Sequence, residues 1–188
     1  MNDSEVRMAE PSRTRKAVLD ATVELLTEGG LAAATIDAIR DRSGVSKTTI
    51  YKHWPNRLCV AVDAFTDRLA FDASPSDTGS AQNDLAAQIR AVSAFYSSAI
   101  GTVFADLLVS ARQDRDAHEW LTSRMSASRQ HGIDVLWQRT VERGATRTEI
   151  SPDLALDILF GPVMWRLLTG RDPLSEDEIE TLVASVLK

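Results

Sequence analysis

A run of hydrogen-bond donors occupies residues 47–53. We expect its polar members to project outward: Lys47, Thr48, Thr49, Tyr51, Lys52 and His53. Such side chains can donate to phosphate oxygens and to the acceptors on base edges. The run contains no carboxylate, which would repel a polyanion. This composition predicts contact with double-stranded DNA.

Local signals predict how these donors are positioned. Thr35 is a good N-cap for a helix over 36–42, and Gly44 stands where that helix must end in a left-handed residue. Ser46 can cap a second helix over 47–53, on which Ile50 points back toward the first. The segment therefore predicts a helix-turn-helix.

The sequence of residues 44–55, GVSKTTIYKHWP, resembles the turn and recognition helix of the tetracycline-repressor (TetR) family of bacterial transcriptional regulators. The resemblance extends from about Arg13 to Phe65. It implies a cytoplasmic bacterial homodimer that binds a palindromic operator, usually as a repressor, and is released by a small-molecule effector. No cofactor is implied.

A helix in the major groove places its first residues against base edges, so we expect Lys47, Thr48 and Thr49 to read bases. The resemblance implies that Thr49, Tyr51, Lys52, His53 and Arg57 also contact the DNA backbone. Thr35 and Ser46 would add hydroxyls at the starts of the two helices. Tyr51 and His53 could instead pack beneath the following helix, and Arg13, Arg15 and Lys16 are equally interpreted as DNA contacts or as a solvated helix start.

Two residues depart from the family pattern. Arg40 stands where a small alanine usually packs between the two short helices, so we expect its long side chain to extend outward or the crossing to loosen. Thr48 replaces a residue that is often glycine or alanine, which leaves the preferred operator open.

Charge and composition limit the alternatives. The formal net charge is -6, but residues 1–60 carry nine basic and eight acidic side chains while residues 61–188 carry twelve and nineteen. Positive charge is therefore local, which suits a confined DNA site. The single cysteine, Cys59, excludes an internal disulfide and is expected to be a small buried side chain. No apolar run approaches the roughly 20 residues that a bilayer requires, so no membrane partner is expected.

Apolar residues recur at intervals of three and four, which predicts an all-α fold of about nine helices. We expect a disordered tail over 1–11, a helix-turn-helix domain over 12–56 and a larger helical effector-binding and dimerisation domain over 57–188. The expected helices span 12–28, 36–42, 47–53, 57–71, 81 to about 100, 102–113, 115–143, 152–168 and 176–187. The first is expected to stop at the glycine pair 29–30, and Asn56 and Ser80 are expected to cap the fourth and fifth. Ser151 followed by Pro152 predicts the start of the penultimate helix, and Ser175 with Glu178 predicts a capping box for the last.

The larger domain should supply a ligand pocket and a dimer interface. The candidate pocket residues are large and mostly aromatic: Phe95, Tyr96, Phe104, Leu108, Trp120, Trp137, Met164 and Trp165. The penultimate helix is apolar on more than one face and needs cover on two sides, which a second subunit can provide. The candidate interface residues come from the last two helices: Leu156, Phe160, Val163, Leu167, Ile179, Leu182, Val183 and Val186.

The alternatives are a helical enzyme and a ligand-binding scaffold without DNA-binding activity. Against an enzyme, the sequence has only three histidines, no metal-ligand spacing, no glycine-rich phosphate loop and no nucleophile set with a matching base. The scaffold has one hint in its favour, the unusual Arg40. Binding to duplex DNA would distinguish the regulator from both alternatives.

Overall fold

The computed structural model describes residues 13–72, 76–147 and 149–188, without the side chains of 71, 72 and 127–133. Over these ranges the predicted all-α class is confirmed, with nine helices. Their bounds are α1 (Arg13–Ala33), α2 (Ile36–Ser43), α3 (Lys47–His53), α4 (Arg57–Asp72), α5 (Ala81–Tyr96), α6 (Ala99–Gln113), α7 (Arg115–Glu142), α8 (Pro152–Thr169) and α9 (Glu176–Val186). The predicted tail over 1–11 lies outside the described residues.

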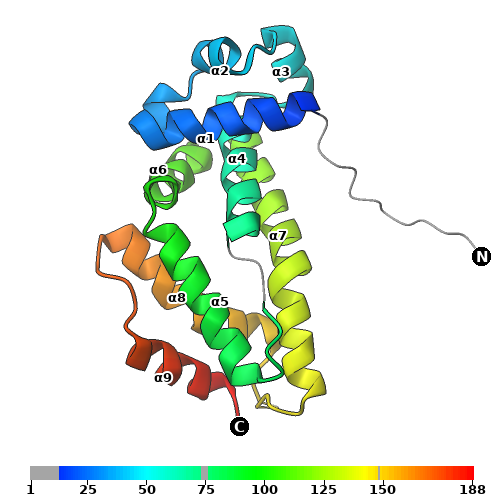
Figure 1. The fold of residues 1–188 in the computed structure, drawn as a ribbon, viewed down its shortest axis with the longest axis vertical. Helices are drawn as coiled ribbons and strands as arrows, with labels where there is room; N and C mark the ends of the chain where they lie inside the picture. Colours follow the sequence, from blue (N-terminus) through cyan, green and yellow to red (C-terminus); the bar gives the residue numbers. More distant parts are fainter. Residues whose placement is uncertain (1–12, 73–75, 148) are drawn as a thin grey trace, which may run out of the picture.

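The helices are arranged along one long axis (Figure 1). α2 and α3 lie at one end, above α1, which runs across the tops of α4 and α7. α5, α8 and α9 lie toward the opposite end, where the C-terminus also lies. α4 packs against α1 on one side and α7 on another, so it joins the two ends of the molecule.

The helix boundaries near the N-terminus follow the predicted caps. α1 is interrupted at Gly29 and Gly30, whose backbone angles are not helical, and a short helical segment follows to Ala33. The regular part of the helix therefore ends at the predicted glycine pair. Asn56 caps α4, because its side-chain oxygen accepts hydrogen bonds from the amides of Leu58 and Cys59 at 2.9 and 3.1 Å.

The boundary between α5 and α6 differs from the prediction. α5 ends at Tyr96 rather than near residue 100, and α6 begins at Ala99 rather than at 102. Ser98 caps α6 by accepting from the Gly101 amide at 3.2 Å. Gly101 does not stop a helix: a Cβ there would lie 2.0 Å from the Phe95 carbonyl oxygen. Glycine is needed because the two helices meet closely at this corner.

The last two helices begin as predicted. Ser151 accepts from the Leu154 amide at the start of α8, where Pro152 is the first helical residue. Ser175 and Glu178 form the predicted capping box of α9. The C-terminal residues are held by an isolated antiparallel bridge between Thr146 and Leu187.

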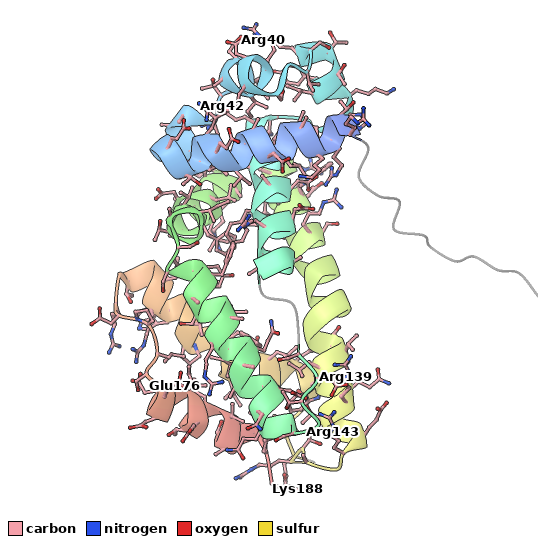
Figure 2. All side chains as sticks on the ribbon, in the orientation of Figure 1. Arg40, Arg42, Arg139, Arg143, Glu176 and Lys188 are labelled. Carbon is pink, nitrogen blue, oxygen red and sulfur yellow. The ribbon has the colours of Figure 1, made fainter. Side chains whose placement is uncertain are left out.

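A buried carboxylate, Asp84, joins elements at the end of the molecule opposite α2 and α3. Asp84 on α5 accepts from the Thr78 amide at 2.7 Å, from the Thr78 hydroxyl at 2.6 Å and from Arg143 at 2.8 Å. Arg143 also donates to Asp77 at 2.7 Å. These bonds fix the segment before α5 to the end of α7, where Figure 2 labels Arg139 and Arg143.

Within the described ranges, no single helix is long and apolar enough to cross a membrane. The pair α5 and α6, which is bent by 79°, reaches the required length and composition only when its two helices are taken together.

Candidate nucleic-acid interface

The predicted helix-turn-helix is present and its caps have the expected geometry. The Thr35 hydroxyl accepts from the Ala38 amide at 3.1 Å, and Ser46 accepts from the Thr49 amide at 3.2 Å. Gly44 adopts φ +70°, the left-handed conformation that ends α2. Ile50 is fully buried, so it fixes which face of α3 points inward.

The opposite face of α3 is open to solvent. Thr48, Tyr51, Lys52 and His53 are exposed, and 54% of the Tyr51 surface is accessible. Tyr51 therefore does not pack beneath α4. The ring of His53 meets the ring of the buried Trp54 edge-on at 5.6 Å between centroids. The outer face of α3 thus offers hydroxyl, phenol, imidazole and ammonium donors to a partner.

Lys47 already has a partner within the chain, which sequence reasoning missed. Its ammonium lies 2.7 Å from the Asp37 carboxylate on α2, and this hydrogen bond, with the charges of Lys47 and Arg40, lowers the Asp37 pKa despite opposing desolvation. Arg40 lies 3.0 Å from the same carboxylate and 2.6 Å from Asp41. Its side chain extends outward as expected, at the end of the molecule seen in Figure 2.

Several other basic residues near α3 are bound within the protein. Arg42 pairs with Glu28 at 2.8 Å, Lys16 pairs with Asp20 at 2.7 Å, and Arg57 donates to the Leu31 carbonyl at 2.6 Å. Arg57, expected to contact the DNA backbone, therefore supports the end of α1 in this structure. Lys52 on α3 is exposed, whereas Lys47 is only partly exposed and paired with Asp37.

Sequence reasoning also missed Asp63 on α4, whose side chain is fully buried. Its Oδ2 accepts from Trp54 Nε1 at 2.8 Å and pairs with Arg15 at 2.7 Å. Its Oδ1 accepts from Trp120 Nε1 and from Arg124 Nε, both at 2.7 Å. Arg15 is therefore not simply a solvated residue at the start of a helix. The signal available in the sequence was an acid inside the apolar run 58–65.

The candidate pocket residues do not line one common cavity in the described part of the structure. Phe95 and Phe104 are core residues: each packs against Phe65, and the Phe65 and Phe104 rings stack at 4.1 Å. Trp120 and Trp137 line separate hollows, and Leu108 and Met164 pack against the core. Trp165 is 60% exposed in the single chain, because its face of α8 points outward, so its assignment to a pocket has no support here.

Tyr96 does line a cavity, of about 220 Å³, between α5, α6 and α8. Its side chain is largely buried, and burial raises its pKa, so its hydroxyl stays protonated and able to donate. Ser93, Ser97, Thr102 and Arg171 line the same cavity. This arrangement combines an apolar wall with several hydroxyl groups.

The predicted interface residues divide between the inside and the outside of the chain. Five are buried within the single chain, namely Leu156, Val163, Ile179, Val183 and Val186, and three are partly exposed, namely Phe160, Leu167 and Leu182. The five point toward their own core, because α8 and α9 pack on each other and on α5. A different stripe of α8, hereafter the outer stripe, consists of Leu154, Ile158, Gly161, Trp165 and Leu168, and all but the partly buried Ile158 are exposed.

Comparisons with known proteins cover both ends of the chain. Residues 18–58 match the family described as "Bacterial regulatory proteins, tetR family", and residues 75–186 match "Tetracyclin repressor-like, C-terminal domain".

Two relatives and one solved structure are similar over most of the chain. The HTH-type transcriptional regulator YdeS of Bacillus subtilis is 32% identical over 93% of this chain and 88% of its own length. The DNA-binding transcriptional repressor TetR of Mycobacteroides abscessus is 26% identical, over 96% of this chain and 95% of its own. The crystal structure of TetR family transcription regulator SCO0332 matches with a TM-score of 0.82 at 30% identity, covering 92% of this chain and 96% of that one.

Proposed function

This chain belongs to the TetR family of DNA-binding transcriptional regulators, and we propose that it represses transcription as a homodimer that reads a palindromic operator through α3. The supporting observation is the outer face of α3, where a series of donors projects from a helix whose inner face is fixed by the buried Ile50. A helix presented in this way can enter the major groove.

The first turn of α3 carries the groups suited to reading bases. Lys47 can donate to guanine O6 and N7, and the Thr48 methyl can contact a thymine methyl. Thr49 lies beside the Ser46 cap, with 2.9 Å between their hydroxyl oxygens, and would be positioned by it. Tyr51, Lys52 and His53 would hold phosphates and fix the register.

Reading by Lys47 requires it to leave Asp37. Both side chains are about half exposed, and exposed ion pairs contribute little to stability. A guanine or a phosphate can therefore replace the carboxylate at small cost. Arg40 remains beside Asp37 and would keep that carboxylate compensated after Lys47 has turned to DNA.

The proposed dimer forms through the outer stripe of α8. Its members recur at intervals of four and three residues, so they share one face of the helix. The exposed Trp165, Leu154 and Leu168 form an apolar surface that a second copy can cover. A twofold pair can place two α3 helices about 34–36 Å apart, which corresponds to one turn of DNA.

The proposed effector site is the Tyr96 cavity. It would accept a small molecule with an apolar body and an acceptor group for the phenol hydroxyl. α6 borders this cavity and also packs against α1, so a ligand that displaces α6 can move the DNA-reading end. A ligand that prefers a differently spaced dimer must lower operator affinity.

Selection from a pool of random duplexes tests the proposal. The full chain should enrich an inverted repeat whose half-sites are about 10 base pairs, or a multiple, apart. In titrations on that duplex, Lys47→Ala should lose roughly tenfold in affinity and relax the preference at one base pair per half-site. The matched variant Lys52→Ala should weaken selected and random duplexes alike and reduce the salt dependence.

Two results would contradict the proposal. One is the absence of any enriched sequence. The other is an equal loss by Lys47→Ala on selected and random duplexes, which would assign Lys47 to the phosphates instead.

A further inference from the structure

Asp63 is a buried carboxylate at the junction between the DNA-reading end and the rest of the molecule. Its side chain has no solvent exposure, and donors reach it from α1, α7 and the residue that ends α3. A buried charge is stable only when its partners satisfy it, and a carboxylate can accept about four hydrogen bonds. The neighbours of Asp63 supply that number.

The four donors form two matched pairs. Arg15 and Trp54 come from the DNA-reading end, with the guanidinium 5.3 Å from the indole centroid. Trp120 and Arg124 come from α7, with a corresponding distance of 5.1 Å. Each pair gives Asp63 one indole N–H and one guanidinium. The carboxylate therefore joins the two ends of the molecule through equivalent groups.

The position of Trp54 makes this junction relevant to DNA reading. Trp54 is the C-cap of α3, and its backbone amide donates to the Ile50 carbonyl at 3.0 Å. Its indole is held by Asp63, so the end of α3 cannot rotate without breaking that bond or moving α4. If α7 shifts, the bonds from Trp120 and Arg124 lengthen and leave the buried charge partly uncompensated.

We propose that Asp63 is a positioning residue that couples α7 to α3, so that movement of α7 changes the placement of the DNA-reading helix. The proposal rests on the proposed reading of DNA by α3, and it adds the route by which the larger domain controls it. Trp120 and Arg124 act on DNA affinity through Asp63, without contacting the duplex.

The test uses conservative variants on both sides of the carboxylate. Trp120→Phe and Trp54→Phe each remove one indole N–H and retain an aromatic ring for the neighbouring arginine. Arg115→Ala is the control, because it removes an 88% exposed arginine from the same helix α7. Amide hydrogen exchange is measured on the free protein, and affinity is measured on the duplex that the parent chain selects from random DNA.

We expect Trp120→Phe to raise exchange in α3 and the first turn of α1, with α9 unchanged, and to weaken DNA binding about tenfold. Arg115→Ala should change neither. Unchanged exchange in α3, or an equal rise in α3 and α9, would overturn the proposal. Since exchange needs no DNA, failure to select a duplex would count against operator reading and not against this coupling.

A double-mutant cycle isolates the role of Asp63. Trp54→Phe and Trp120→Phe should have non-additive effects on α3 exchange, because both act on one carboxylate. In an Asp63→Asn background the same two substitutions should become additive. If the Asp63→Asn protein does not fold, the cycle of Trp54→Phe and Trp120→Phe in the otherwise unchanged chain is sufficient. Additive effects in that cycle would refute the coupling.

Discussion

The Asp37 carboxylate is neutralised by two cationic neighbours. In the free protein both Lys47 and Arg40 lie within 3.0 Å of its Oδ1 oxygen. If Lys47 alone were present, its departure toward DNA would leave an acid facing phosphates. In the proposed complex Arg40 would still neutralise Asp37, which gives a physical reason for the long basic side chain at this position.

Cys59 should behave as a buried apolar residue and not as a redox sensor. Burial raises the pKa of its thiol to about 11, so the reactive thiolate is scarce at neutral pH. We expect the native chain to react with Ellman's reagent at least about a hundredfold more slowly than the chain unfolded in guanidinium. Comparable rates in the two states would show that the thiol is accessible.

The sequence predicted residues whose partners are close along the chain. The caps at Thr35 and Ser46 bond to amides three residues away, so their signals are local. The partners of Asp63 lie up to 61 residues away, and no spacing rule connects them. Arg57 was assigned to DNA for the same reason, because its bond to Leu31 depends on how α1 bends back.

At the scale of elements, the corner between α5 and α6 depends on Gly101. A Cβ would meet the backbone of Phe95 and Tyr96 at 2.0–2.8 Å, and backbone atoms cannot yield as a flexible side chain can. We expect Gly101→Ala to lower the free energy of unfolding by about 2–3 kcal/mol, measured by urea denaturation. Val109→Ala, at a 58% exposed site on the same helix, should change it by less than about 0.5 kcal/mol.

Equal urea midpoints for Gly101→Ala and Val109→Ala would show that the corner between α5 and α6 can open without loss of stability. The sequence did not place this corner, because the fifth helix was expected to run to about residue 100 and the close contact at Gly101 was not visible in the sequence. The function of this glycine, the close approach of two helices, depends on which backbone atoms surround it.

The hydrogen bonds of Asp84, which join α5 to the end of α7, should make the stability of the protein depend on pH. Burial alone would raise the pKa of Asp84, but bonds from Thr78 and Arg143 outweigh it and hold the pKa below its usual value near 3.8. A carboxylate whose pKa is lower in the folded than in the unfolded state stabilises the folded protein at any pH above its unfolded-state pKa. This stabilisation is lost as the pH falls below about 4. Asp84→Asn should therefore unfold at lower urea than the parent at pH 7.

The difference in urea midpoint between parent and Asp84→Asn should narrow as pH falls from 5 to 3. Asp106→Asn, an exposed site on α6, serves as the control and should follow the parent throughout. A difference that stays constant over this range would mean that the Asp84 charge does not contribute to stability.

At the scale of the whole molecule, regulation requires that distant parts move together. The Tyr96 cavity is bordered by α5, α6 and α8, and the outer stripe lies on α8; Figure 1 shows α5 and α8 toward the end of the molecule opposite α3. α4 joins the two ends directly, α6 packs on α1, and α7 reaches the end of α3 through Asp63 on α4. Sequence periodicity predicted the helices, but it could not show which faces meet, so most of the expected interface residues proved to be core.

The outer stripe gives the proposed dimer a specific test at Trp165. This ring is 60% exposed in the single chain, and large aromatic residues at the centre of an interface commonly dominate its energy. Trp165→Lys should raise the dimer dissociation constant at least about 30-fold in analytical ultracentrifugation. It should weaken binding to the selected inverted repeat but leave the affinity for a single half-site unchanged, because α3 is untouched.

Val109→Lys introduces the same charge at a 58% exposed valine on α6, and it should leave both measurements at the parent value. An unchanged dissociation constant for Trp165→Lys would place the twofold contact on another face, and the half-site spacing would then have to be set by different helices.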